Sequence, residues 1–100
     1  MNIAGRLDRA GVTILTYFTM TSGTLTVATV GSSTAGLAPF MISETGSTFN
    51  MSGGTIIVER AGNGNLGFLN TGGTINTVTG GTLQMGDAST PAAQTMQTFG

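Results

Sequence analysis

The sequence predicts an all-β protein built from stacked repeats, and three observations support this fold class. Threonine occurs 19 times in 100 residues, while lysine, cysteine, histidine and tryptophan are absent; β-branched residues favour strands over helices. Glycine occurs 17 times, against about 7% in average proteins. A segment in which a Ser-Gly or Gly-Gly pair precedes a Thr-led apolar run occurs three times. We therefore expect short strands, many tight corners and very little helix.

Size and charge exclude several classes of protein. One hundred residues correspond to about one small domain. The net charge is -1, and the only cations are Arg6, Arg9 and Arg60, so no basic patch is present to bind a nucleic-acid backbone. The absence of cysteine excludes a disulfide framework but does not assign a compartment.

The N-terminal segment, 1–15, is expected to be irregular or to form a partial coil. Arg6 and Arg9 precede an apolar stretch that could be mistaken for a signal peptide, but threonines interrupt it, so we expect it to form a strand. No stretch approaches the roughly 20 apolar residues of a membrane-spanning helix. We therefore expect no membrane insertion by this segment.

The remainder, residues 16–100, contains the repeats. Residues 16–27 align with residues 47–58 at an offset of 31, and the third copy follows the second at an offset of 27. Self-similarity at a period of 20 to 50 residues is typical of stacked repeat architectures. The repeats are expected at about 16–46, 47–73 and 74–100.

Each repeat is expected to contain three strands in a fixed order. The first strands are predicted at 17–20, 48–51 and 74–78, and the second strands at 24–27, 55–58 and 82–85. A corner separates them, where glycine suits a positive φ angle. The corner glycines are Gly23, Gly53, Gly54, Gly80 and Gly81. Third strands are predicted at 39–43, 66–70 and 94–99, after connectors at 28–37, 59–65 and 86–93 that we expect to project outward.

Alternation places one apolar face of these strands inward. If the repeats stack in parallel, like residues lie over like residues and form core columns. The predicted columns contain Phe18 and Phe49; Met20, Met51 and Val78; Leu25, Ile56 and Leu83; and Val27, Val58 and Met85. This arrangement is a parallel β-helix, or solenoid, of about three coils. The alternative is a set of antiparallel hairpins in a sandwich or barrel, because a Gly-Gly centre also fits a tight hairpin turn.

The repeat residues resemble a known class of protein. "FNMSGGTIIV" at 49–58 and "GGTLQMGDASTPAAQTMQTF" at 80–99 are similar to β-strand repeats of very large secreted surface proteins of Gram-negative bacteria. These include adhesin-like chains, autotransporter passenger domains and cargo of the type IX secretion route. The resemblance covers residues 16–99 and implies a right-handed β-helical stalk exported to the cell surface. Because the chain has about three repeats and no sorting domain, we expect it to be a fragment.

Motifs that could carry chemistry are few. "GNGNLG" at 62–67 matches a dinucleotide-binding pattern, but that pattern must open a helix, and a strand and turn are expected here. The acids are Asp8, Glu44, Glu59 and Asp87, and stacking could make Glu59 and Asp87 neighbours. Glycosidic cleavage uses two carboxyl groups about 5 to 10 Å apart, but we favour solvated charges that protect strand ends. We predict no catalytic residue, no cofactor site and no metal site.

These observations favour a non-enzymatic structural or adhesive segment of an extracellular cell-surface protein. Its expected partners are flanking repeats of the same polypeptide, together with surface glycans or host or abiotic surfaces contacted by the connectors. The first alternative is a carbohydrate-binding or carbohydrate-cleaving β-helix, although Tyr17 is the only aromatic residue other than phenylalanine. A further alternative is a hairpin protein that forms fibres through exposed strand edges.

Overall fold

The computed structural model describes residues 1–5, 7, 17–30, 38–42, 44–62, 66–70, 75–91 and 96–99. These residues form β-strands and no helix. The strands are β1 (Asn2–Ile3), β2 (Tyr17–Met20), β3 (Thr24–Val27), β4 (Phe40–Ile42), β5 (Thr48–Met51), β6 (Thr55–Val58), β7 (Leu66–Asn70), β8 (Ile75–Val78), β9 (Thr82–Met85) and β10 (Gln97–Phe99). Strands β2 to β10 each lie within one of the nine predicted segments.

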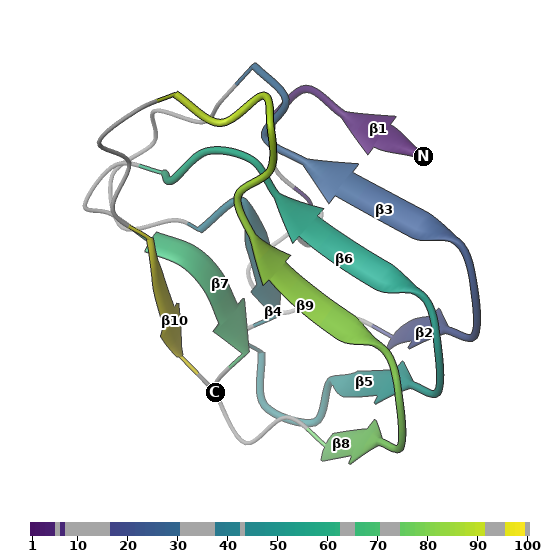
Figure 1. Ribbon diagram of the computed structural model, residues 1–100. Helices are drawn as coiled ribbons and strands as arrows, with labels where there is room; N and C mark the ends of the chain where they lie inside the picture. The colour runs from purple at the N-terminus through teal and green to yellow at the C-terminus, as the bar shows by residue number, and fades with distance from the viewer. Residues whose placement is uncertain are drawn as a thin grey trace.

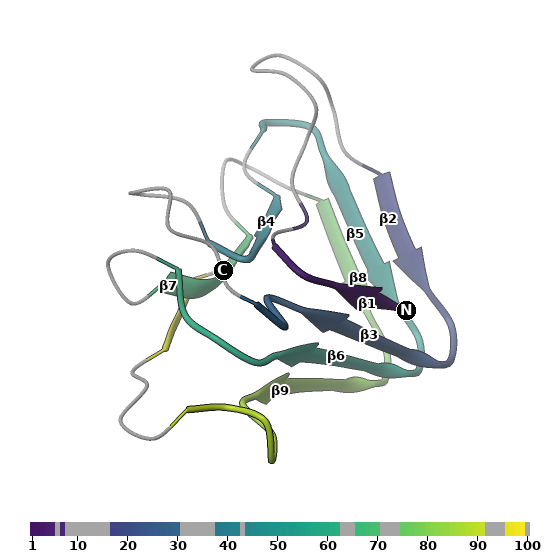
Figure 2. The same cartoon turned by 90° about the horizontal axis from the view of Figure 1, so that it is seen from above.

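The strands form three sheets, which we call A, B and C. Sheet A has the order β1-β3-β6-β9, sheet B has the order β10-β7-β4, and sheet C has the order β2-β5-β8. From β2 to β10 the chain passes through sheets C, A and B three times (Figure 1). We call the three strands of one passage a rung: β2 to β4, β5 to β7, and β8 to β10. Viewed from above, the three sheets surround a common interior (Figure 2).

Every strand pairing among the described residues is parallel. The corner at Gly53 and Gly54 joins β5 in sheet C to β6 in sheet A, so these two strands do not pair with each other. The corners at Gly23 and Gly81 likewise join strands of different sheets. The antiparallel-hairpin alternative is therefore wrong for these strands.

The register of the sheets has the same offsets as the sequence alignment. Phe18 pairs with Phe49 and Leu25 with Ile56, as the alignment of the first two repeats predicts. From the second rung to the third, Ile56 pairs with Leu83, as the alignment of the last two repeats predicts. Because a slip of one residue would turn every apolar side chain to the opposite face, this register keeps the apolar rows continuous.

The core lies between the three sheets and contains residues from each of them. Its buried apolar residues are Met20, Leu25, Val27, Phe40, Ile42, Phe49, Met51, Ile56, Val58 and Phe68, while Phe18 and Met85 are partly buried against them. Seven of the predicted column residues are thus buried, and burial of a large apolar side chain contributes about 1.5 to 3 kcal/mol. The core also includes Phe40, Ile42 and Phe68 of sheet B, which were not in the predicted columns.

Four phenylalanine rings form the centre of the core between sheets B and C. Phe18 stacks on Phe49 with ring centroids 5.4 Å apart, and Phe40 stacks on Phe68 at 5.0 Å. The two stacked pairs meet edge to face, with Phe18 and Phe40 5.1 Å apart at an interplanar angle of 89°. Both arrangements suit the charge distribution of aromatic rings. The parallel register therefore aligns like rings from successive rungs.

Two predicted column residues are not buried. Val78 is 59% exposed and Leu83 is 40% exposed. They continue the rows of Met51 and Ile56, but they lie on β8 and β9, which are edge strands in the described part of the chain. The assignment of Val78 and Leu83 to a closed core is therefore corrected: their inner surfaces have a neighbouring rung on one side only.

The corner glycines are required for two different reasons. Gly23, Gly54 and Gly81 have φ angles of +83°, +87° and +102°, which residues with a Cβ rarely adopt. Gly53 and Gly80 are restricted by space instead, because a Cβ at these positions would lie 2.4 Å from the Thr21 oxygen and 2.6 Å from the Ser52 oxygen. The corners of the second and third rungs thus rest against the backbone of the rung before them.

The N-terminal segment adds part of a rung before β2. Asn2 and Ile3 pair with Thr26 and Val27 of sheet A, and Leu7 forms an isolated parallel bridge with Phe40 of sheet B. The terminal ammonium group of Met1 donates a hydrogen bond to the Thr24 carbonyl at 2.9 Å. The described residues of this segment therefore extend sheet A by one short strand and contact sheet B through Leu7.

Candidate functional site

The strongest polar cluster lies at the ends of the sheet A strands, where the connectors begin. Glu59 follows β6 and Asp87 follows β9, separated from it by Gly86. The parallel ladder continues past these strands, because the Glu59 amide donates to the Val27 carbonyl at 3.1 Å and the Gly86 amide donates to the Val58 carbonyl at 2.8 Å. This ladder brings Glu59 and Asp87 together from neighbouring rungs.

Glu59 differs from the solvated end-of-strand charge expected from the sequence. The residue is only 8% exposed, and the expectation of a solvated charge was therefore wrong. Burial raises the pKa of Glu59 above its ordinary value of 4.5, and the Asp87 carboxylate raises it further by accepting a hydrogen bond and by charge repulsion. Arg60 opposes both effects and lowers this pKa. Burial and the neighbouring Asp87 thus both favour the protonated form of Glu59.

Arg60 connects the Glu59 carboxylate to backbone carbonyls of the first and third rungs. Its Nη1 donates to the Glu59 Oε2 at 3.2 Å, to the Ala28 carbonyl at 3.4 Å and to the Thr29 carbonyl. Its Nη2 donates to the Ser89 carbonyl at 3.4 Å. Because the guanidinium group has several donors in a fixed plane, one side chain can bind the starts of all three connectors. In the sequence Arg60 is identifiable only as one of three cations, and no sequence pattern predicts this role.

Asp87 is held in a tight turn of the third connector. Its Oδ1 accepts a hydrogen bond from the Ser89 amide at 2.8 Å, and its own amide donates to Thr90 Oγ1 at 2.8 Å. The Thr90 amide also donates to the Asp87 carbonyl at 3.1 Å. This is the turn geometry that Asp residues stabilise through local backbone contacts. One carboxylate oxygen of Asp87 is therefore already used by the protein itself.

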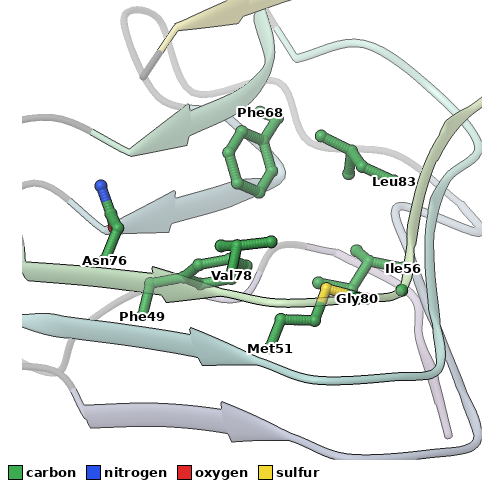
Figure 3. A pocket seen from close by; sticks show the side chains of 9 residues that line it. Phe49, Met51, Ile56, Phe68, Asn76, Val78, Gly80 and Leu83 are labelled. Atoms are coloured by element: carbon green, nitrogen blue, oxygen red, sulfur yellow. The ribbon is translucent and has the colours of Figure 1, made fainter.

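A second candidate site is an apolar cavity at the third-rung end of the molecule. It has a volume of about 270 Å³. Its lining comes from the second and third rungs and contains Phe49, Met51, Ile56, Phe68, Asn76, Val78, Gly80, Gly81 and Leu83. Figure 3 shows the apolar side chains around this space. None of the lining residues is ionisable, so the cavity offers shape and apolar surface but no general acid or base.

The remaining residues noted in the sequence occupy separate places. Residues 63–65 of the "GNGNLG" motif lie outside the described residues, but β7 begins at Leu66. A strand therefore begins within the motif and continues beyond it, where nucleotide binding would need a helix. Tyr17 is 72% exposed on β2, and Glu44 lies in the turn before β5. Asp8, Arg6 and Arg9 lie outside the described residues.

The connectors are described only in part. Residues 31–37, 63–65 and 92–95 lie outside the described residues, so the prediction that the connectors project outward stays a prediction there. At their described starts, Ala28 and Glu59 are buried while Val30 is 77% exposed. These starts are bound to one another through Arg60.

Neither a metal cluster nor a membrane helix is found in the described part of the chain. No group of three or more histidine, cysteine, aspartate or glutamate residues there is arranged to hold a metal ion. None of its segments forms a helix of the length and apolarity needed to cross a bilayer.

Comparisons with protein-family models, with curated proteins and with solved structures found no match. The proposal for function therefore rests on sequence pattern, fold and site geometry.

Proposed function

We propose that the chain is a non-catalytic structural or adhesive segment of an exported cell-surface protein, folded as a right-handed parallel β-helix. The observation that carries this proposal is the parallel register of successive rungs, which has the offsets of the sequence repeats. Hydrogen-bond ladders and apolar rows that run from rung to rung suit a stiff stalk. The resemblance of residues 16–99 to β-strand repeats of bacterial surface proteins supports the location.

The polar cluster fits a structural role better than a catalytic one. Arg60 is bound to Glu59 and to carbonyls of Ala28, Thr29 and Ser89, and Asp87 is bound within its own turn. Such contacts fix the starts of the connectors along one end of sheet A. We infer that the connectors beyond them contact surface glycans or host or abiotic surfaces, and that flanking repeats of the same polypeptide continue the stalk.

The surface location is tested on cells of the source organism. Antibodies raised against this chain are expected to label intact cells, and protease treatment of intact cells is expected to remove the label. An antibody against a ribosomal protein serves as the control, because it labels only lysed cells. Labelling that requires lysis would overturn the proposed location.

A second candidate function is carbohydrate cleavage, and one observation favours it. Glu59 has a raised pKa beside the Asp87 carboxylate, which is the electrostatic arrangement of a general acid next to a second carboxylate. Incubation with acidic and neutral polysaccharides tests this function through release of reducing ends. Turnover that Glu59→Gln abolishes and Glu44→Gln does not would replace the structural proposal with an enzymatic one.

A further inference from the structure

The third-rung end of the molecule is an unfinished packing surface. Val78 and Leu83 are 59% and 40% exposed, and they border the cavity that reaches down to Ile56 and Phe68 of the second rung (Figure 3). Strands β8 and β9 are both edge strands among the described residues. Their residues include no ionisable group, although charges commonly protect exposed edges. The surface therefore combines unpaired strand edges with an open apolar interior.

The opposite end is partly covered. Asn2 and Ile3 of β1 pair with the second half of β3, and Leu7 bridges to Phe40. The Met1 ammonium group and carbonyl bind Thr24 and Thr26 of the same strand. Among the described residues the two edges of sheet A therefore differ: β1 has two residues, whereas β9 has four and borders the apolar cavity through Leu83.

The corners specify what can stack on this end. Gly53 and Gly80 each lie where a Cβ would come within 2.4 to 2.6 Å of a carbonyl oxygen in the preceding rung. A rung that follows β8 and β9 in the same register would meet the corner after Val78 in the same way, so it needs glycine there. The first rung of a second copy has Ser22 at this position, aligned with Gly53. Stacking of a second copy onto this end is therefore obstructed by Ser22 as well as by β1.

We propose that this end is the docking surface for one further rung of the same polypeptide, with a Gly-Gly corner and apolar residues over Val78, Leu83 and Met85. A further rung would continue an interface that the protein already has, because the second and third rungs pack in this way, with Met51 over Val78 and Ile56 over Leu83. This inference rests on the proposed function, because it identifies the flanking repeat as the occupant.

The test extends the full chain by one rung. A second copy of residues 44–70 placed after Gly100 leaves the same spacing between β10 and the added β5 segment as the chain has between β4 and β5. We expect the amides of β8 and β9 to gain protection from hydrogen exchange. We also expect the midpoint of thermal unfolding to rise by about 5 °C or more.

Two variants make the result decisive. Replacing Gly53 by Ser in the added copy alone is expected to remove most of the gain in exchange protection and in unfolding midpoint. Leu83→Asp in the extended chain is expected to cancel both gains. The unextended Leu83→Asp chain is expected to fold. Unchanged hydrogen exchange in β8 and β9 would overturn the proposal. It would also be overturned if the added rung with Gly53 and the added rung with Ser in its place raised the unfolding midpoint equally. Self-association of the unextended chain that Leu83→Asp abolishes would overturn it as well, in favour of a second copy as occupant. Neither result depends on cell labelling or polysaccharide turnover, which test the proposed function separately.

Discussion

A Cβ atom at Gly53 would lie 2.4 Å from the backbone oxygen of Thr21, in the preceding rung. The corner of the second rung therefore contacts the corner of the first so closely that the second can have no side chain there. The equivalent position in the first rung is Ser22, which is exposed. This difference between two aligned positions follows from their place in the stack, since Gly53 has a rung beneath it.

We predict that Gly53→Ala destabilises the protein while Ser22→Ala does not. The added methyl group at Gly53 must displace backbone, and overpacking of this kind costs about 1 to 3 kcal/mol. Ser22→Ala only removes an exposed hydroxyl group, and surface changes of this kind usually stay within about 0.5 kcal/mol. Urea unfolding followed by circular dichroism measures both. Equal effects of the two variants would show that the corners do not rest on one another.

The inward direction of the sheet A side chains leads to a second prediction. Ile56 is fully buried, whereas its neighbour Ile57 is partly exposed on the other face. Ile56→Asp places a charge in the core and is expected to lower the free energy of unfolding by about 4 kcal/mol or more. Ile57→Asp adds the same charge one residue away and is expected to cost much less. A retained β-type spectrum and an unchanged melting point for Ile56→Asp would refute the inward assignment.

The phenylalanine cluster gives a third prediction. Phe40 contacts the rings of Phe18, Phe49 and Phe68, and it is fully buried. We expect Phe40→Ala to lower the free energy of unfolding by about 3 to 5 kcal/mol, because it leaves a cavity and removes three ring contacts. Tyr17→Ala is the control, because Tyr17 is 72% exposed. A loss below about 1 kcal/mol for Phe40→Ala would place the cluster outside the core.

The carboxyl pair predicts a specific dependence of stability on pH. The pKa of Glu59 is raised in the folded protein by burial and by Asp87, so the folded state holds its proton at a higher pH than the unfolded state does. The contribution of Glu59 to stability is therefore complete below its pKa in the unfolded state, near 4.5. It is lost as the pH rises through the pKa of Glu59 in the folded state. Chemical unfolding at a series of pH values measures the slope of the free energy of unfolding against pH.

Glu59→Gln isolates this contribution, because glutamine keeps the shape and a hydrogen-bond donor but does not titrate. Between the unfolded-state pKa of glutamate and neutral pH, we expect the free energy of unfolding of the variant to depend less on pH than that of the parent. At neutral pH the variant is expected to be at least as stable as the parent. Glu44→Gln removes an equal charge elsewhere and is expected to leave the slope in place. A slope that survives Glu59→Gln would mean that another group is responsible.

Local pattern and repetition were sufficient to predict most of the strands and their register. The alternation of apolar residues located β5 and β6, and the alignment of Phe18 with Phe49 in the sequence is also their pairing in sheet C. The local sequence does not distinguish parallel from antiparallel strands, because a Gly-Gly pair suits both a corner and a hairpin. The choice depends on pairing between strands far apart in the chain, which no local pattern reports.

Three features could not be predicted for physical reasons. The surroundings of Glu59 include Asp87 and the multiple contacts of Arg60, which arise only when connectors from three rungs meet. The pairing of Asn2 with Thr26 belongs to a strand too short for a periodic signal. The exposure of Val78 reflects its place on an edge strand, since its sequence pattern is the same as that of buried Met51.

The parallel stacking of rungs is tested most directly by nuclear Overhauser effects between backbone protons. Short contacts are expected between β5 and β8 and between β6 and β9, with Ile56 opposite Leu83, and no antiparallel contacts are expected between β5 and β6. Antiparallel contacts between β5 and β6 across Gly53 and Gly54 would instead identify a hairpin and contradict the stacked-rung structure.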